Sequence, residues 1–284
     1  MKSRRIFLIA ILLLPLSACG LIAIGYNYAE AYLRYSINSY TSFNDAQKDA
    51  IYKEVNIYMA WHRKNMLAEY VMFLQELQQS ARSAALLTKQ DASRFRSEVR
   101  VLYVKTLQPT ILPAARILSS VDPEQVDELV QSFAKENKKQ KDKELSGNQD
   151  EQLRKRAERT IDFVENLVGN LKDEQLEKIR ELNHHLPFVS GIYMSQRENN
   201  QAELIELLKN HKGEDEIAAF LSSWLLTPEA TRTEDERSIM LAFENASDEM
   251  IVALYQMLTE RQKKTLLKNI QKYIDTCQEL AGKT

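Results

Sequence analysis

Residues 45–80 contain neither glycine nor proline, and apolar or aromatic side chains recur there at every third or fourth position. Since an α-helix turns once in 3.6 residues, this period gathers one set of side chains on one helical face. That face is formed by Ile51, Val55, Tyr58, His62, Met66, Tyr70, Phe73 and Leu77. We predict one helix of about ten turns over this stretch, a length that fits an elongated helical architecture.

The same helical period returns along most of the remaining chain. Further helices are expected over 188–210, 214–226, 233–245, 247–257 and 259–280. No segment alternates apolar and polar residues with the period of two that is typical of a strand. Glycine is scarce, at 7 of 284 residues, whereas proteins average about 7% and β folds need it in their turns. We therefore predict an all-α fold of about nine or ten helices packed as antiparallel hairpins.

Composition divides the chain into five segments. An export signal comes first, and a tyrosine-rich segment follows it directly. Two helical halves come next, separated by a stretch of mixed charge around Ser146-Gly147-Asn148 that we interpret as a frayed helix end and a mobile loop. The five segments, in chain order, are 1–18, 19–44, 45–134, 135–150 and 151–284.

The first residues have the three zones of a bacterial export signal. Basic residues precede an apolar run from Ile6 to Leu14, which is shorter than the ~20 residues that span a bilayer. The next residues, Leu16-Ser17-Ala18-Cys19, resemble the lipobox of bacterial lipoproteins, in which small residues suit the peptidase and the cysteine thiol accepts a diacylglyceryl group. The resemblance implies cleavage before Cys19 and lipid on that cysteine. The alternative is an ordinary signal peptide or membrane anchor with a chance cysteine.

The residue after the cysteine is Gly20. In Gram-negative lipoproteins, the absence of aspartate at this position implies sorting to the outer membrane. The resemblance therefore implies a protein held by lipid on the periplasmic face of that membrane. Two or three acyl chains bind a bilayer far more tightly than one, at ~0.8 kcal/mol per buried methylene, so the membrane is the first expected partner.

The charge balance argues against nucleic acid as a partner. Cleavage removes Lys2, Arg4 and Arg5 from the 38 basic residues, which leaves 35 against 40 acidic residues and a net charge of about −5. Nucleic-acid binding needs a basic footprint, which this chain lacks. With Cys19 acylated, Cys277 has no disulfide partner. Its position on an apolar stripe predicts a small buried side chain rather than a reactive thiol.

The sequence contains no pattern typical of catalysis or metal binding. A helical zinc pair needs two ligands on one face, typically four residues apart, whereas the adjacent His184 and His185 diverge by about 100° on a helix. There is also no Gly-x-Ser-x-Gly elbow, phosphate-binding glycine loop or cysteine pair with metal spacing. We predict a non-enzymatic protein, and we infer no metal, cofactor or small-molecule ligand.

The triplet Trp61-His62-Arg63 is the densest local cluster of aromatic and charged residues. One interpretation is a recognition patch, in which Arg63 and Trp61 stack or bind a carboxylate or phosphate. The other is a helix packing point, in which His62 is a hydrogen-bonded core residue. We favour the packing interpretation.

Tyrosines dominate the segment that follows the lipidation cysteine. Tyr28, Tyr32 and Tyr35 share one helical face, and no polar tether separates them from Cys19. The domain should therefore sit close to the bilayer. Tyrosine suits the boundary between water and lipid because it has an apolar ring and a polar tip. This face either contacts the membrane or packs on the core of the protein, and the sequence leaves both open.

One local pattern recurs: an apolar residue, a small polar or acidic residue, two variable positions, then glutamine. It is a capping box, in which the polar side chain accepts a bond from a helix N–H and the glutamine reaches back to the N–H of the capping residue. All-helical proteins need many such caps, and the irregular spacing of the copies argues against a solenoid. Complete copies are Phe43–Gln47, Val121–Gln125 and Leu258–Gln262, and partial copies are Leu87–Asp91, Leu171–Gln175 and Leu226–Ala230.

Several of these features together resemble one known family. The lipobox, Tyr26-Asn27, the Trp61-His62-Arg63 triplet, and Leu258 to Gln262 followed by Tyr273 are similar in order and spacing to proteobacterial lipoproteins grouped as domain of unknown function 6279. That family has no established activity, so the resemblance implies localisation and fold. Leu258–Gln262 also resembles the Leu-Thr-x-x-Gln motif of Spy-type periplasmic chaperones.

We therefore expect a membrane-anchored periplasmic lipoprotein that acts as a protein-interaction or scaffold protein, with unknown envelope proteins as partners. The alternative is a Spy-like chaperone that binds unfolded clients without ATP. An envelope hydrolase would need clustered acids or histidines in a deep pocket.

Overall fold

The computed structural model describes residues 19–83 and 87–282, with side chains from residue 23 onward. Across the described residues the chain forms twelve α-helices and two short 3-10 helices, and the predicted all-α fold is confirmed. The helices are α1 (Cys19–Asn27), α2 (Ala29–Asn38), α3 (Asp45–Arg82), α4 (Lys89–Leu107), η1 (Gln108–Thr110), α5 (Ile111–Leu118), α6 (Pro123–Glu144), α7 (Gln149–Val168), α8 (Asp173–His185), α9 (Ser190–Lys209), α10 (Glu214–Leu226), η2 (Pro228–Thr231), α11 (Glu234–Gln256) and α12 (Glu260–Ala281).

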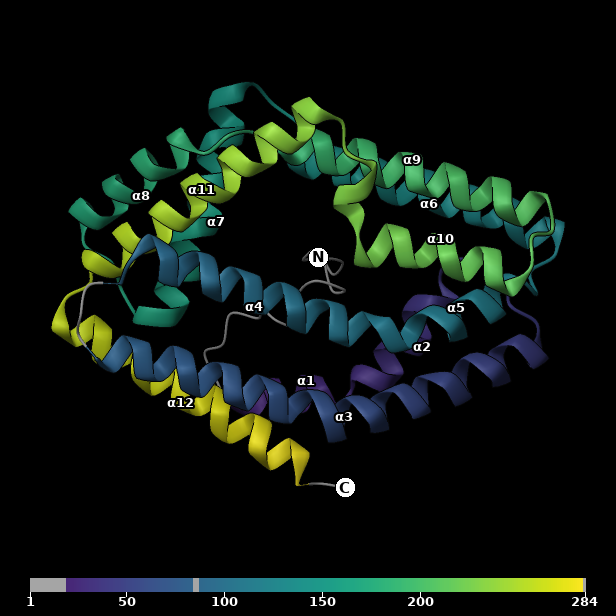
Figure 1. The fold of residues 1–284 in the computed structure, drawn as a ribbon, viewed down its shortest axis with the longest axis horizontal. Coiled ribbons are helices and arrows are strands. Elements are labelled where there is room, and N and C mark those ends of the chain that lie inside the picture. The colour runs from purple at the N-terminus through teal and green to yellow at the C-terminus, as the bar shows by residue number, and fades with distance from the viewer. Residues whose placement is uncertain (1–18, 84–86, 283–284) are drawn as a thin grey trace.

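The long helix predicted over 45–80 is α3, which has 38 residues and runs along most of the long axis of the molecule (Figure 1). Its largest contact is with α12, from the opposite end of the chain, and it also packs on α2 and α4. Sequence neighbours such as α7 and α8 form hairpins, whereas α5 with α10, α6 with α9 and α4 with α11 join distant segments.

The face of α3 predicted from the sequence is the face that the fold buries. Its buried positions include Ile51, Val55, His62, Met66 and Tyr70. The first two enter a hydrophobic cluster with α2, and Met66 and Tyr70 enter another with α1 and α12. Periodicity alone therefore located the contact surface of the longest helix.

A pair of buried glutamines joins the N-termini of α3 and α6. Gln47 Nε2 donates to Gln125 Oε1 (3.0 Å), and Gln125 Nε2 donates to Gln47 Oε1 (2.7 Å). Each Oε1 also accepts the backbone N–H of its own N-cap residue, Asn44 or Asp122. Each Nε2 also donates to the backbone carbonyl two residues before the N-cap of the partner helix. The predicted capping boxes are present, and they are joined to each other.

The same arrangement recurs between α8 and α12. Gln175 Nε2 donates to Gln262 Oε1 (3.0 Å), and Gln262 Nε2 donates to Gln175 Oε1 (2.9 Å). The N-cap N–H groups of Lys172 and Thr259 and two backbone carbonyls complete the set, as in the first joint. Figure 1 shows α3 beginning at one end of the long axis and α12 at the other, so the two glutamine joints lie at opposite ends of the molecule.

Part of the predicted loop over 135–150 is helical. α6 continues to Glu144, and only residues 145–148 separate it from α7. The polar residues are held by a contact with α9, where Asn137 is buried and its Nδ2 donates to Gln201 Oε1 (2.6 Å). The local sequence is compatible with a loop, and this contact, with the Lys141–Glu198 ion pair, holds the helical form against α9.

The two helices predicted over 233–245 and 247–257 are one helix, α11. Asp248, placed by the prediction in the first turn of a second helix, lies in the middle of α11 and is 1% exposed. Its carboxylate binds a side chain of α4, as described below, so tertiary structure overrides the local pattern of a helix start.

Candidate functional site

His62 lies where α1, α3 and α4 meet, and it is 3% exposed. Its Nδ1 is 2.9 Å from the hydroxyl of Tyr26 on α1, and its Nε2 is 3.2 Å from the hydroxyl of Tyr70 on α3. The Tyr70 hydroxyl is also 2.8 Å from Thr106 Oγ1 on α4, which donates to the Leu102 carbonyl. This chain of hydrogen bonds connects α1, which begins at Cys19, to α3 and α4.

Burial keeps the cluster uncharged. It lowers the pKa of His62 from 6.5 to about 4. It raises the pKa of Tyr26 from 10.0 to about 12, although the neighbouring Arg63 charge acts in the opposite direction. Burial raises the pKa values of Tyr58 and Tyr70 as well. A neutral, enclosed imidazole with a hydroxyl at each nitrogen is suited to holding helices together and is inaccessible to an external substrate.

The other two members of the predicted triplet, Trp61 and Arg63, lie around the His62 joint, which is the hydrogen-bonded set of Tyr26, His62, Tyr70 and Thr106. The Trp61 ring lies 5.9 Å from the Tyr58 ring, and it packs at the edge of the cluster that contains Met66. The Arg63 guanidinium lies 5.6 Å from the centre of the Tyr26 ring. Two residues of the triplet therefore contact Tyr26, and these contacts are of the helix-packing kind. A ligand-recognition role for the triplet stays a prediction.

The predicted tyrosine face is mostly turned outward. Tyr28 and Tyr35 are 67% and 62% exposed, whereas Tyr32 is half-buried. Cys19, the predicted lipidation site, is the first residue of α1. The predicted cleavage residues 16–18 lie outside the described residues, as does the rest of the signal segment.

Cys277 lies on α12 beside the same joint and packs against the cluster that includes Met66 and Leu280. Burial raises the pKa of its thiol to about 11. Because the thiolate is the reactive form, this side chain is a poor nucleophile at neutral pH. It is half-buried, so it is less enclosed than the sequence suggested.

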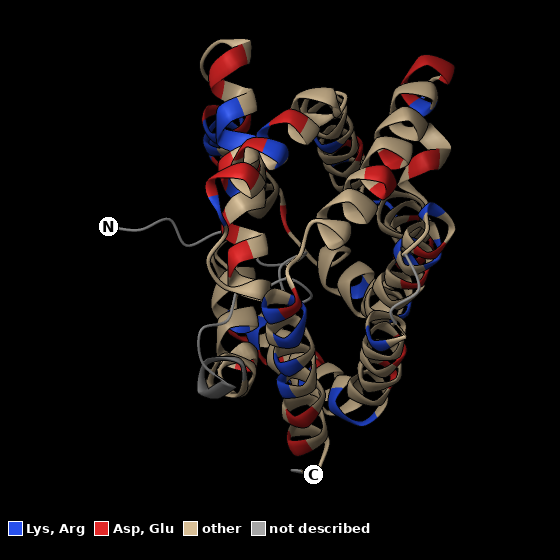
Figure 2. Ribbon diagram, turned by 90° about the vertical axis from the view of Figure 1, so that its left-hand side faces the viewer, with Lys and Arg blue, Asp and Glu red and all other residues tan. Residues whose placement is uncertain are grey.

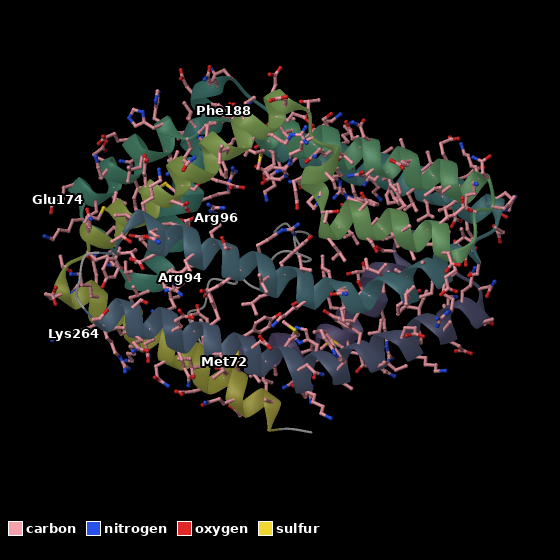
Figure 3. All side chains as sticks on the ribbon, in the orientation of Figure 1. Met72, Arg94, Arg96, Glu174, Phe188 and Lys264 are labelled. Carbon is pink, nitrogen blue, oxygen red and sulfur yellow. The ribbon has the colours of Figure 1, made fainter. Side chains whose placement is uncertain are left out.

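An ion-pair network between α4 and α11 was not predicted. Arg96 binds Asp248 through two bonds of 3.0 Å each and binds Glu244 at 2.9 Å. Figure 3 shows Arg96 on the side of α4 that faces α11. The Asp248 side chain is only 2% exposed, so the arginine supplies the countercharge that a buried carboxylate requires. In the sequence, these residues look like ordinary members of charged helix surfaces.

The described residues contain no group of three or more His, Cys, Asp or Glu side chains that could hold a metal ion. Two open hollows are lined mainly by charged and polar residues, partly through the apolar stems of their side chains. One lies between α3 and α12 and includes Arg82, Lys264 and Lys268. The other lies between α4 and α11 and includes Ser93, Asn245 and Asp248. Figure 2 shows acidic and basic residues interspersed along the helices. In the part of the chain that is described, no helix is long and apolar enough to cross a bilayer.

The fold and these joints define an all-helical protein in which hydrophobic clusters and buried polar contacts join distant helices. The chain belongs to a family of unknown function, DUF6279, whose family model matches residues 39–237. The match includes the α3–α6 glutamine joint, and it includes His62, Tyr70 and Thr106 but not their partner Tyr26. It ends before Leu258–Gln262, the segment that resembles Spy-type chaperones. No curated protein and no solved structure matches the chain.

Proposed function

We propose that this protein is a lipoprotein of the bacterial cell envelope, anchored through Cys19 on the periplasmic face of the outer membrane. Its role is non-enzymatic: it positions a rigid helical body close to the membrane as an interaction or scaffold protein for other envelope proteins. Leu16-Ser17-Ala18-Cys19 supports the anchor, and Gly20 supports the choice of membrane.

The observation that carries the proposal is the path of the chain directly after Cys19. This residue opens α1, and Tyr26, only seven residues later, is already bonded to the buried His62. α1 also packs on α12. At 1.5 Å per residue, seven helical residues span about 10 Å, so lipid on Cys19 would hold the body at a short and defined distance from the bilayer. A fixed distance suits a scaffold, whereas a protein that captures diffusing clients gains reach from a flexible tether.

The chaperone alternative rests on Leu258–Gln262, and that segment is used inside the fold. Gln262 is 3% exposed and bonded to Gln175. The motif therefore stabilises a helix joint and leaves the glutamine no surface at which to meet a client.

Crosslinking in cells tests the proposal. A photo-crosslinking amino acid replaces, one at a time, Val101 on α4, Leu112 on α5 and Leu241 on α11, which are 52%, 55% and 60% exposed. We expect one discrete adduct with an envelope protein from at least one of these positions. The matched control is the same variant with Cys19→Ser, in which loss of the lipid should remove the adduct.

Two outcomes contradict the proposal. A spread of adducts with many unrelated proteins, together with suppression of the aggregation of an unfolded model protein, would favour the chaperone alternative. An adduct of equal yield in the Cys19→Ser background would show that the partner is found without the membrane, and the anchor would then have no positioning role.

A further inference from the structure

α1 and α2 together present an uncharged outer face. The backbone N–H of Tyr28 donates to the Ile24 carbonyl (3.1 Å) and that of Tyr32 to the Tyr28 carbonyl (3.0 Å), so the helical hydrogen bonds continue across the junction. Ile24, Tyr28 and Tyr35 are separated by about one and two helical turns and thus share a side. They are 51%, 67% and 62% exposed.

The opposite side of the same two helices is packed on the body. Ala29, Leu33 and Ile37 enter the hydrophobic cluster around Ile51 and Val55 of α3. These two helices therefore carry apolar side chains on two sides, one packed on the protein and one, which includes tyrosines, facing the surroundings. In Figure 1 the two helices lie beside α3, away from α11.

Charge is almost absent from this part of the chain. Residues 19–44 contain only Glu30 and Arg34, although 27% of all residues are charged. The two are joined by a contact of 2.5 Å, and Arg34 also bonds Asn56 and lies 4.8 Å from the centre of the Tyr52 ring, both on α3. The arginine thus turns toward α3. Glu30 is 43% exposed, but it lies two residues from Tyr28 and therefore about 200° around the helix. The outer face formed by Ile24, Tyr28 and Tyr35 thus contains no charged residue that a membrane interface would desolvate.

We propose that Ile24, Tyr28 and Tyr35 lie in the headgroup region of the leaflet that holds the Cys19 acyl chains, so that α1 and α2 rest along the membrane surface. This inference rests on the proposed lipid anchor. Ile24 is five residues, or about 8 Å, from Cys19, comparable with the ~5–8 Å depth of each interfacial region. Tyr35 lies about 24 Å along the helices, so it reaches the interface only if they lie roughly parallel to it.

Tyrosine and isoleucine are suited to this position. An aromatic ring with a hydroxyl at its edge sits at the boundary of acyl chains and water. An amphipathic helix lying in the membrane plane gains affinity from its buried apolar area. The acyl chains bring this face to the bilayer, and the face in turn fixes how the body is tilted.

Site-directed spin labelling of the full lipidated protein in phosphatidylethanolamine–phosphatidylglycerol vesicles tests the inference. A nitroxide is attached to Tyr28→Cys or Tyr35→Cys, and the matched control is Leu241→Cys, which is 60% exposed on α11. Labelling near pH 7 favours the exposed cysteine, because burial raises the pKa of Cys277 to about 11. Collision rates are measured with oxygen, which concentrates in lipid, and with a water-soluble nickel chelate.

We expect the ratio of oxygen to nickel collision rates to be severalfold higher at positions 28 and 35 than at 241. Adding Tyr28→Glu to the Tyr35→Cys protein should lower the ratio toward that of the control. Equal ratios at all three positions would overturn the inference, because the face would then meet water. Low collision rates with both reagents would also overturn it, since a protein or a second copy would then cover the face.

Mass spectrometry and vesicle flotation of the same samples separate the two proposals. Acylated protein that floats with vesicles but has water-exposed labels refutes the membrane-facing surface and leaves the anchor intact. Protein without acyl chains on Cys19 that fails to float refutes the anchor, and with it the inference that depends on it.

Discussion

Replacing His62 with glutamine should flatten the pH dependence of stability between pH 7 and pH 4. In the folded protein the pKa of His62 is about 4, against 6.5 for an unperturbed histidine. Between these values the unfolded chain binds a proton that the folded protein excludes, so the free energy of unfolding falls as the pH falls. The difference of 2.5 units corresponds to about 3 kcal/mol at ~1.4 kcal/mol per unit. Because His62 is only 3% exposed, screening by solvent reduces this free-energy contribution very little.

The assay is urea unfolding followed by circular dichroism at pH 7, 6, 5 and 4. Carboxylates make the free energy of unfolding depend on pH in both proteins. The difference in that dependence between wild type and His62→Gln is therefore due to the histidine. Glutamine should lower the free energy of unfolding at pH 7, because the hydroxyls of Tyr26 and Tyr70 lose their imidazole partner. Between pH 7 and pH 4, the free energy of unfolding of the wild type should fall by about 3 kcal/mol more than that of His62→Gln. Parallel curves for the two proteins, or an NMR titration of His62 with a midpoint near 6.5, would refute the reasoning.

Substitutions at three other places in the fold are tested by the same unfolding assay. Gln262→Leu should lower the free energy of unfolding by about 2–3 kcal/mol because it leaves buried partners unpaired. The double variant with Gln175→Leu should lose less than the sum of the two single variants. Strict additivity would mean that the two amides are not coupled. Arg96→Ala should lower the free energy of unfolding by about 1.5–3 kcal/mol, since Asp248 would lose two charge-assisted hydrogen bonds while Arg96 itself is 36% exposed; a loss below about 1 kcal/mol, as for exposed pairs, would show that the pair is solvated. Gly169→Ala should lower the free energy of unfolding by about 1–3 kcal/mol, because Gly169 has φ 82° and ψ −170°, a region open almost only to glycine. The loss would come from the backbone alone, since a Cβ at this position would meet no atom within 4 Å. An unchanged midpoint of urea unfolding would contradict this.

The parts of the fold that depend on local sequence were predictable. Residues 45–80 form the expected helix because nothing interrupts the period, and His62 and Met66 are buried as that period predicts. The capping boxes at Asn44 and Thr259 form as expected, because a cap is made within four residues.

Contacts between distant helices were not predictable from one sequence. Gln47 and Gln125 are 78 residues apart, and Gln175 and Gln262 are 87 apart. A signal was nevertheless present, because the four boxes that end in glutamine are the four that join in pairs. The Leu87–Asp91 box ends in aspartate, and its cap at the start of α4 is exposed.

The candidate site was found only in part. The triplet at residue 61 was singled out, but its partner Tyr26 was noted only as a mark of family resemblance, because a helix face does not reveal what packs on it. Arg96 and Asp248 carry charges that usually face water, so their burial follows only from the crossing of α4 and α11.

The central claim is that lipid on Cys19 holds this helical body on a membrane. Its most direct test is the intact mass and membrane fractionation of the protein from cells, for wild type and for Cys19→Ala. We predict a mature chain that begins at Cys19, carries diacylglyceryl on its thiol and fractionates with the outer membrane, and a Cys19→Ala chain that lacks this modification and is absent from the outer-membrane fraction. A wild-type chain with unmodified mass, or a Cys19→Ala chain that still pellets with the outer membrane, would contradict the claim.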